Sequence, residues 1–260
     1  MILDDIVAAK RGHVRRLKKA FSQSRLEGLI KNRPPRRSLK KALELGTGPR
    51  VIAEVKRAAP SRGPIDLEAD AAQVARAYQA GGAAAVSVLT DEPFFKGRAE
   101  DLMQARQAVE LPVLCKDFLV EEFQVQLAAA MGADAVLLIT AILDRERLRD
   151  LLALAHGLDL EALVEVHDRA ELETALSTGP SLLGINNRNL KTMRVDLETT
   201  RTLAAEVGPG ITLVSESGLS SRKDLDRLMV AGVRAFLIGT SLMQAKNRTL
   251  ALQALLGEKS

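Results

Sequence analysis

The sequence predicts a (β/α)8 TIM barrel, a closed parallel sheet surrounded by helices, with an N-terminal helical extension. From residue 51 onward, eight short runs rich in Val, Leu, Ile and Ala alternate with longer amphipathic stretches. Near-continuous apolar strands indicate a parallel sheet covered by helices, and eight units in about 200 residues match a barrel. The alternative is an open doubly wound sheet, which ordinarily has fewer strands and a glycine-rich first turn where this chain reads RAAPSRGPI.

The eight predicted strands start 22 to 32 residues apart. They are VIAEVK (51–56), AAAVSVL (83–89), PVLCK (112–116), DAVLLI (134–139), LEALVEV (160–166), LLGIN (182–186), ITLVS (211–215) and AFLIG (235–239). The stretches between them read as helices, and most end at a glycine, a common helix stop. These stretches are 69–82, 99–109, 121–132, 144–157, 168–179, 197–208 and 222–232.

Residues 1–50 precede the barrel pattern and are strongly basic. They hold 14 Lys and Arg against 4 Asp and Glu, a balance of +10, so the remaining 210 residues carry −6 of the net +4. We expect two or three helices here, interrupted at Arg33-Pro34-Pro35-Arg36. No second domain is expected, so residues 1–260 form a single barrel domain with this extension.

The composition of the chain excludes several classes of protein and of functional site. One cysteine, Cys115, rules out an internal disulfide framework, and three scattered histidines leave no metal-binding cluster. No apolar run approaches the ~20 residues of a membrane helix, and the N-terminus lacks the features of a signal peptide. Phe21 is the only aromatic residue in the basic extension, which disfavours single-stranded nucleic acid as a partner. We expect a cytoplasmic protein without a structural metal.

Polar residues gather where barrel enzymes place their chemistry, at the C-terminal ends of the strands. Glu54 and Lys56 are two apart in the first run and therefore face the same side of a strand. On an interior face they form either a structural ion pair or part of a site. Six of the eight runs end in such residues, which favours a site: Glu54 and Lys56, Cys115-Lys116-Asp117, Glu165, Asn186-Asn187-Arg188, Ser215-Glu216-Ser217-Gly218, and Gly239-Thr240-Ser241.

The last two strand ends indicate a phosphate-bearing ligand. The turns Ser217-Gly218 and Gly239-Thr240 combine small residues, hydroxyls and backbone N–H groups ahead of predicted helices. Barrels usually bind phosphate with such helix N-termini and closely approaching glycines. Two of these turns on adjacent strands predict that the ligand carries a phosphate.

Four charged residues would face one pocket and supply acid, base and electrostatic roles: Lys56, Lys116, Glu54 and Glu165. A lysine near a second cation or away from water has a lowered pKa, and a glutamate in an apolar rim has a raised pKa. We therefore expect these directions of shift. A Schiff base between Lys56 or Lys116 and a carbonyl substrate is one alternative, and a structural ion-pair network across the mouth is another.

Four further residues attract attention. Cys115 alternates with Lys116, so it should face the helices and be inert. His167 is expected to be a loop residue whose polar atoms are satisfied by its neighbours. Phe95 and Phe118 follow predicted strands, and either core packing or an aromatic pocket wall fits them.

Ten segments that span essentially the whole chain carry a family resemblance. In order they are ILDDIVAAKR, IAEVKRAAPSRGPI, AGGAAAVSVLTDEPFFKG, LPVLCKDF, GADAVLLI, LVEVHD, GINNRNLKT, DLETT, VSESGL and FLIGTSLM. Together they resemble indole-3-glycerol phosphate synthase, a barrel enzyme of tryptophan biosynthesis. The other phosphate-binding barrels share only the last two turns, so the combination is specific.

The resemblance implies ring closure of 1-(2-carboxyphenylamino)-1-deoxyribulose 5-phosphate to indole-3-glycerol phosphate, with loss of CO2 and water and without cofactor or metal. It implies that Lys116 is the general acid that protonates the departing carbonyl oxygen. Glu165 matches the general base that assists dehydration. Lys56 matches the lysine that meets the substrate carboxylate, which has also been assigned a proton-donor role.

The resemblance also implies the binding residues and the partner. Glu54 and Asn186 match groups that orient the catalytic residues and the substrate hydroxyls, and Arg188 matches the arginine near the chain and phosphate. The phosphate grip matches Ser217, Gly218, Gly239 and Thr240, and the apolar wall matches Phe95, Phe118, Leu137, Ile139, Leu190 and Leu237. The extension would cover the barrel mouth. We expect a phosphorylated small molecule as partner, no nucleic acid or membrane, and a monomer or weak homodimer.

One departure from the family pattern concerns substrate affinity. The family usually reads KR-x-SPS after the first strand, whereas this chain has KRAAPS, with Ala59 in place of a serine. The missing hydroxyl removes one hydrogen bond, on the order of 1 kcal/mol, and implies a weaker KM. A phosphoribosyl isomerase or Schiff-base aldolase, and a catalytically silent barrel whose basic arm binds nucleic acid, are the alternative functions.

Overall fold

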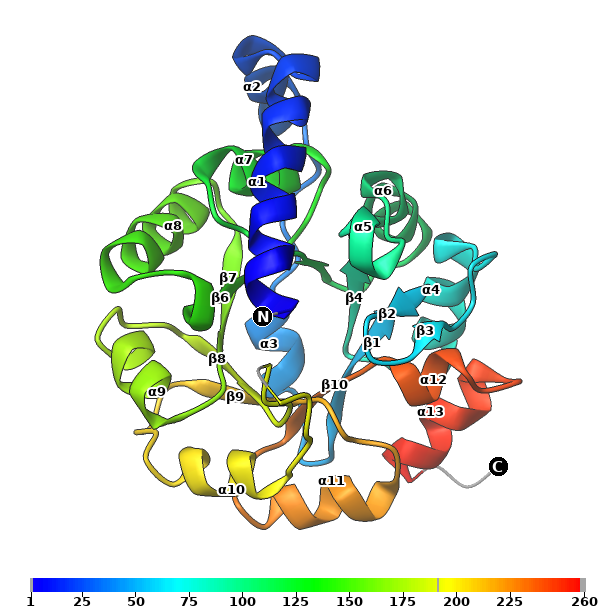
Figure 1. Cartoon of the computed structure of the whole chain (residues 1–260). Helices are drawn as coiled ribbons and strands as arrows, with labels where there is room; N and C mark the ends of the chain where they lie inside the picture. Colours follow the sequence, from blue (N-terminus) through cyan, green and yellow to red (C-terminus); the bar gives the residue numbers. More distant parts are fainter. Residues whose placement is uncertain (1, 191, 258–260) are drawn as a thin grey trace.

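The predicted barrel is confirmed by the computed structural model, which describes residues 2–190 and 192–257 (Figure 1). Eight parallel strands close in the order β1-β10-β9-β8-β7-β6-β5-β4. Each overlaps one predicted run. The strands are β1 (Arg50–Val55), β4 (Ala85–Leu89), β5 (Val113–Lys116), β6 (Ala135–Ile139), β7 (Glu161–Val166), β8 (Leu182–Asn186), β9 (Thr212–Glu216) and β10 (Ala235–Ile238).

Helices cover the outside of the barrel. They are α4 (Ala71–Ala80), α6 (Ala99–Ala108), α7 (Glu122–Ala130), α8 (Arg145–Gly157), α9 (Arg169–Leu176), α10 (Glu198–Ala204), α11 (Arg222–Met229) and α13 (Arg248–Leu256). The first seven match predicted helices, whereas α13 was not among them. Asp70, Asp144 and Asp168 begin their helices by accepting a hydrogen bond from the backbone N–H three residues on. No helix in the described part of the chain is both long and apolar enough to cross a membrane.

Alternating strand side chains pack into two separate cores. In β1, Val51, Ala53 and Val55 belong to the core between sheet and helices, whereas Ile52 belongs to the barrel interior. Inward and outward positions therefore follow the two-residue period of a strand. The interior core contains Ile52, Ala85, Leu114, Ala135, Leu137, Leu163, Leu182, Val214, Ala235 and Leu237.

Short elements absent from the sequence prediction lie in the loops that connect strands to helices. They are the hairpin β2 (Ala58–Ala59) and β3 (Gly63–Pro64), helix α5 (Glu92–Phe95), the 3-10 helix η1 (Thr140–Ile142) and helix α12 (Thr240–Met243). Each follows the C-terminal end of a barrel strand. They therefore build up the rim where the predicted site lies.

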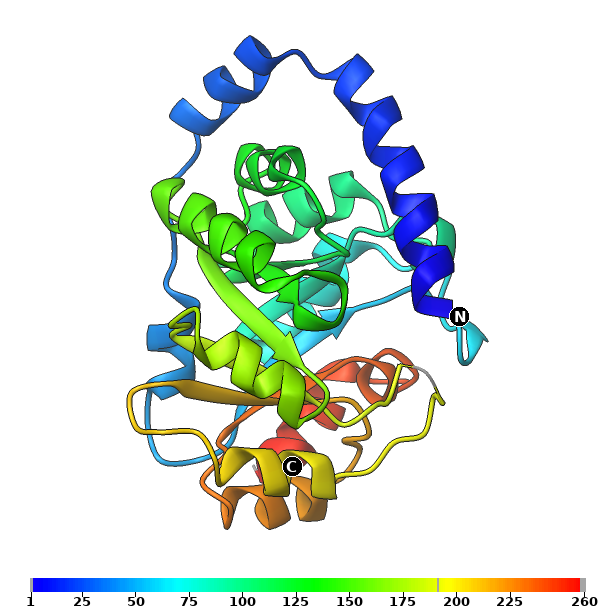
Figure 2. The ribbon, with the colours of Figure 1, turned by 60° about the vertical axis from the view of Figure 1, so that its left-hand side comes forward.

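The extension consists of α1 (Ile2–Ala20), α2 (Gln23–Lys31) and α3 (Leu39–Glu44), with the predicted break between α2 and α3. It arches along one side of the barrel (Figure 2). Leu39 and Leu43 of α3 join the interior core at one end, and Ile6 of α1 joins it at the other. We propose that extension and barrel form a single domain, because they share this core.

Helix α1 is fastened to the barrel by a buried ion cluster. Lys10 Nζ lies 2.6 Å from Asp91 Oδ1 and 2.6 Å from Asp117 Oδ1. Lys10 and Asp91 are only 2% and 0% exposed. Since Asp117 directly follows Lys116, this cluster joins the extension to the end of β5.

We expect Lys10→Ala to lower the free energy of unfolding by about 3–5 kcal/mol, because it leaves buried carboxylates without their cation. Urea denaturation at pH 7 measures the loss. Lys18→Ala on the same helix is the control, because Lys18 is exposed and its pair with Glu121 should contribute at most about 1 kcal/mol. Equal losses in the two variants would contradict a special role for Lys10.

Candidate active site

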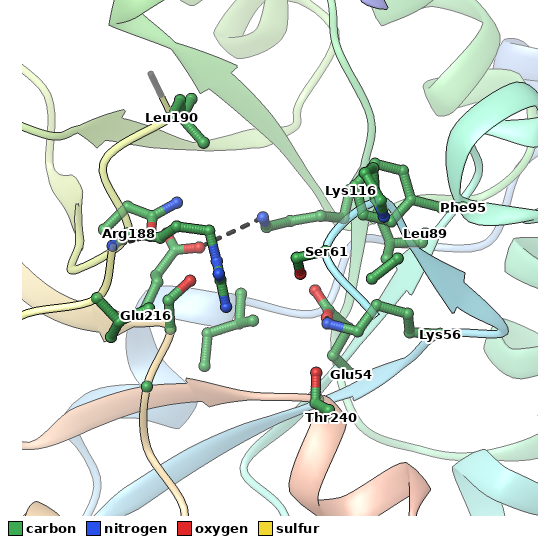
Figure 3. Close-up of a pocket in the computed structure, with 18 of the residues that line it drawn as sticks. Glu54, Lys56, Ser61, Leu89, Phe95, Lys116, Arg188, Leu190, Glu216 and Thr240 are labelled. Carbon is green, nitrogen blue, oxygen red and sulfur yellow. Dashed lines mark hydrogen bonds and ion pairs between the residues drawn. The ribbon is translucent and has the colours of Figure 1, made fainter. Parts of the chain in front are cut away.

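A pocket of about 530 Å³ opens at the C-terminal ends of the strands (Figure 3). Leu3 and Ile6 of α1 also line it. All the residues to which the sequence analysis assigned a catalytic or binding role line it. They are Glu54, Lys56, Phe95, Lys116, Phe118, Leu137, Ile139, Glu165, Asn186, Arg188, Leu190, Ser217, Gly218, Leu237, Gly239 and Thr240. Their chemical roles stay predictions, because lining a pocket does not establish what a side chain does.

Glu54 and Lys56 form an ion pair at the end of β1. Lys56 Nζ donates to Glu54 Oε1 over 2.7 Å. The Glu54 carboxylate lies against Gly239, where an added Cβ would come within 2.4 Å of Oε1, so only glycine fits there. Tyr78 from α4 donates to the Glu54 backbone carbonyl over 3.1 Å. These contacts fix the pair at the edge of the pocket.

Lys116 at the end of β5 lies between two buried carboxylates. Its Nζ is 3.5 Å from Glu165 Oε2 on β7 and 3.4 Å from Glu216 Oε2 on β9. Figure 3 shows the lysine extended across the pocket. One cation therefore serves two carboxylates that come from different strands.

The expected pKa shifts of Lys116 and Glu165 were wrong for the free protein. Burial lowers the pKa of Lys116, but the carboxylates of Glu216 and Glu165 raise it further, to a net value above the ordinary one. Burial raises the pKa of Glu165, but Lys116 and His167 more than reverse this. Neighbouring opposite charge outweighs desolvation here, so Lys116 is an ammonium and Glu165 a carboxylate.

Glu216 is a site residue to which the sequence analysis assigned no role. Burial raises its pKa to about 8; the ammonium of Lys116 opposes this rise, and the charge of Glu165 adds to it. The alternation of side chains along a strand could have identified Glu216 as a site residue. Val214 faces the barrel interior, so Glu216, two residues further along β9, faces it as well.

One ring nitrogen of His167 is satisfied by a neighbour, as expected, whereas the other lies beside the predicted base without a hydrogen bond among the described residues. Its Nδ1 lies 2.9 Å from Glu171 Oε2 on α9. Its Nε2 lies 3.2 Å from Glu165 Oε1. The expectation of a purely local loop role was therefore incomplete.

The side of the pocket near β8 is positively charged. The backbone N–H of Arg188 donates to Asn186 Oδ1 over 3.0 Å, which orients both residues. Burial and the nearby charge of Arg62 lower the pKa of Arg188. Arg62 also lines the pocket, although the sequence analysis did not name it. Two neighbouring guanidinium groups are well suited to a phosphate or carboxylate ligand.

The turn after β9 has the backbone geometry of an anion-binding loop. Ser217 and Gly218 both have positive φ, 66° and 79°. An added Cβ on Gly218 would come within 2.3 Å of Val195 Cγ1. Asn187 Nδ2 donates to the Ser217 carbonyl over 3.1 Å and holds the turn. This turn lines the pocket together with Thr240 at the start of α12, so the two turns predicted to bind phosphate lie in one cavity.

Apolar side chains form another part of the pocket lining. The rings of Phe95 and Phe118 lie 6.0 Å apart between centroids with a 35° tilt. Both line the pocket, and Phe118 also belongs to the interior core, against which Phe95 packs, so both alternatives hold. The apolar lining continues with Leu137, Ile139, Leu190 and Leu237. Such a surface fits an aromatic ring.

Cys115 was predicted to be unreactive, and Ala59 was predicted to weaken substrate binding. Cys115 packs in the core between sheet and helices, as predicted, and burial raises the pKa of its thiol to about 12. Ala59 lines the pocket without a polar atom in its side chain, whereas Ser61 of the same loop directs a hydroxyl toward the cavity (Figure 3). Among the described residues, no group of three or more His, Cys, Asp or Glu side chains is arranged to hold a metal.

Comparison with known proteins assigns the family. The family model described as indole-3-glycerol phosphate synthase matches residues 3–255. The chain belongs to the indole-3-glycerol phosphate synthase family. The synthase of Desulfosudis oleivorans is 45% identical over 98% of both chains. That of Syntrophobacter fumaroxidans is 46% identical over 98% of this chain and 97% of its own.

Solved structures of other enzymes share the fold of this synthase family member. Thiamine phosphate pyrophosphorylase from Pyrococcus furiosus superposes with a TM-score of 0.63 at 19% identity, covering 84% of this chain and 96% of its own. N-acetylmannosamine-6-phosphate 2-epimerase from Clostridium perfringens gives a TM-score of 0.59 at 15% identity, covering 76% and 89%. At such low identity these likenesses show the barrel alone.

Proposed function

We propose that this protein converts 1-(2-carboxyphenylamino)-1-deoxyribulose 5-phosphate to indole-3-glycerol phosphate, CO2 and water in tryptophan biosynthesis. One observation carries the proposal beyond family membership. A single pocket combines a lysine held between two buried carboxylates with arginines and backbone turns suited to an anion and with apolar side chains. These three parts correspond to the reacting centre, the phosphate and the aromatic ring of the substrate.

The substrate would lie across the pocket. Its phosphate would bind the turns at Ser217 and Thr240 with Arg188 alongside, and its ring would pack on Phe95 and Phe118. The ring carboxylate would meet Lys56, whose ammonium is held by Glu54. This placement brings the carbonyl carbon of the sugar chain close to Lys116, at the centre of the pocket.

Lys116 would act as the general acid of ring closure. The aromatic carbon that bears the carboxylate attacks the chain carbonyl, and the carbonyl oxygen takes up a proton as its negative charge develops. Because its pKa is raised, Lys116 keeps its proton until that charge appears. Its positive charge also stabilises the developing alkoxide inside a cavity with little water.

Loss of CO2 and water would complete the reaction without an added electron sink. The electron pair of the breaking carbon–carbon bond restores the aromaticity of the benzene ring, and dehydration then completes the indole. Glu165 would take the proton that is lost during dehydration, because it is ionised in the free protein. Asn186 hydrogen-bonds Glu165 and would orient it.

The phosphorylated substrate is the expected partner, and we propose that nucleic acid is not. Several basic residues of the extension are engaged within the chain. Arg37 donates to the backbone carbonyls of Val109 and Leu111 over 2.6 and 3.0 Å, and Lys10 is buried between carboxylates. We propose a cytoplasmic monomer or weak homodimer, in keeping with a biosynthetic enzyme.

We expect Arg188→Ala to raise KM by about tenfold or more with a much smaller change in kcat, because its charge would contact the substrate phosphate rather than the reacting atoms. Steady-state kinetics at pH 7 measure both constants. Arg149→Ala is the control, because this exposed arginine of α8 pairs only with its neighbour Asp150 in the structure. A fall in kcat with unchanged KM would place Arg188 at the reacting centre instead.

The proposed function is tested by mixing the purified protein with the substrate, without metal or cofactor, and following indole fluorescence. The proposal predicts a rise whose rate saturates with substrate. No indole at any substrate concentration would overturn it. Reduction with borohydride in the presence of substrate tests the aldolase alternative, because trapping on Lys56 or Lys116 would reveal a Schiff base.

A further inference from the structure

His167 is held between two carboxylates at the end of β7. Glu171 Oε2 lies 2.9 Å from Nδ1, and Glu165 Oε1 lies 3.2 Å from Nε2. Glu171 also accepts the backbone N–H of His167 over 2.8 Å, so it holds both the ring and the chain. The histidine side chain is only 7% exposed. Both ring nitrogens therefore face acceptors away from bulk water.

Such an arrangement requires a doubly protonated ring. A neutral imidazole has one N–H and one bare nitrogen, and the bare nitrogen would face a carboxylate oxygen. Burial lowers the pKa of His167, but the contacts with Glu165 and Glu171 raise it to about 10. At pH 7 the ring is therefore an imidazolium that donates from Nδ1 to Glu171 and places its charge 3.2 Å from Glu165 Oε1 at Nε2.

The charged groups around Glu165 come from several strands. Lys116 of β5 lies on its Oε2 side, His167 on its Oε1 side, and Glu216 of β9 shares the contact with Lys116. Asn186 of β8 contributes a neutral hydrogen bond. The neighbouring strand β6 pairs with Glu165 through the apolar Ile139, and the following η1 (Thr140–Ile142) carries no charge. The two cations thus act on different oxygens of one carboxylate.

We propose that His167 is a positioning residue of the active site, which holds Glu165 Oε1 from behind and leaves Glu165 Oε2 facing the pocket. The proposal rests on the proposed function only in taking Glu165 as the base. Without His167 the carboxylate could rotate and present either oxygen. Its charge would also be compensated by Lys116 alone, which is already shared with Glu216.

This arrangement has a consequence for the pH range of the enzyme. A second cation beside Glu165 keeps it ionised at lower pH, so the base stays available in mildly acidic conditions. Removing that cation raises the pKa of Glu165. The acid limb of the kcat profile, where the base becomes protonated, must then move to higher pH.

The first test needs no substrate. The chain contains three histidines, so nitrogen-detected NMR of the 15N-labelled protein shows three imidazole rings, and His167→Gln identifies the signal to follow. We expect the His167 ring to remain doubly protonated at pH 8, and to titrate at lower pH in Glu171→Gln. Titration of the wild-type ring near its ordinary value of about 6.5 would overturn the inference.

The second test follows kcat against pH. We expect the acid limb to move up by about one pH unit in His167→Gln and by less in Glu171→Gln. The double variant should show no further shift over His167→Gln, because Glu171 acts through the ring. His156→Gln on the exposed face of α8 should leave the profile unchanged. Coincident acid limbs in the wild type and His167→Gln would overturn the proposal.

The two tests separate this inference from the proposed function. A wild-type protein that forms no indole would refute the function, while the NMR titration would still report the state of His167. Conversely, an active enzyme with an ordinary His167 titration would keep the function and remove the positioning role. Glu171→Gln keeps the test valid if His167→Gln misfolds, because it leaves the histidine in place and changes a partly exposed side chain.

Discussion

Lys116→Met is expected to lower kcat by about 10²–10⁴-fold, the range typical of a lost general acid, while substrate affinity changes only a few-fold. The methionine fills the space of the lysine but supplies neither a proton nor a charge. Single-turnover kinetics report the chemical step, and titration with the product reports binding. In the proposed binding mode other residues contact the phosphate and the ring, so we expect substrate affinity to be retained.

Lys116→Arg provides the matched control for charge. The guanidinium keeps a cation between Glu165 and Glu216 but gives up its proton far less readily than an ammonium. An acid role predicts that both variants are slow, whereas a purely electrostatic role predicts that arginine restores most of the rate. Circular dichroism must show an intact fold in both variants. A Lys116→Met enzyme with more than about a tenth of wild-type kcat would contradict the assignment.

Glu165→Gln is the second substitution with a large expected effect. The amide keeps the size of the side chain but cannot accept a proton at neutral pH, so we expect kcat to fall by about 10²–10⁴-fold with little change in KM. The acid limb of the pH profile should also disappear, because the group that titrates there is gone. Steady-state kinetics from about pH 3 to 9 measure both effects, because this range includes the ordinary Glu and His pKa values of about 4.3 and 6.5.

Glu161→Gln is the control for this prediction. Glu161 lies on the same strand but at its opposite end, where it pairs with Arg36 over 2.8 Å and accepts from Ser38 over 2.7 Å. Its loss should affect stability and leave kcat near the wild-type value. Equal falls in kcat for the two variants would mean that β7 was perturbed rather than the chemistry.

Strand periodicity explains why the fold and the composition of the site could be predicted. Near-continuous apolar strands at regular intervals required a covered parallel sheet, and the carboxyl ends of such strands meet at one rim. Glu54 and Lys56 illustrate the limit of this reasoning. Their spacing showed that they share a face, but either an ion pair or a site fitted. The structure contains both, an ion pair that lines the pocket.

Protonation states could not be predicted, because they depend on distances between residues far apart in the chain. Lys116, Glu165 and Glu216 come from three different strands, and their pKa values follow from the sum of burial and mutual charge. Burial alone gives the wrong direction for Lys116 and Glu165. The inward orientation of Glu216 could have been predicted from the alternation of side chains along β9. The contact between His167 and Glu165 could not, because it depends on how the chain turns after β7.

The path of the extension could be predicted only through the family resemblance, which implied that it covers the barrel mouth. Its helices and the break at Pro34-Pro35 were predictable from local patterns. Nothing local indicated that α3 would close the far end of the barrel while Leu3 and Ile6 of α1 line the pocket. Lys10 reads as one more basic residue in a charged segment, yet it is buried between two aspartates.

The most direct test of the central claim is the stoichiometry of decarboxylation. Substrate labelled with 14C in the ring carboxylate is mixed with the protein, and released CO2 is counted against indole-3-glycerol phosphate formed. The account predicts one labelled CO2 per indole with the wild type and neither product above background with Lys116→Met. Indole without CO2, CO2 without indole, or equal turnover by the variant would contradict it.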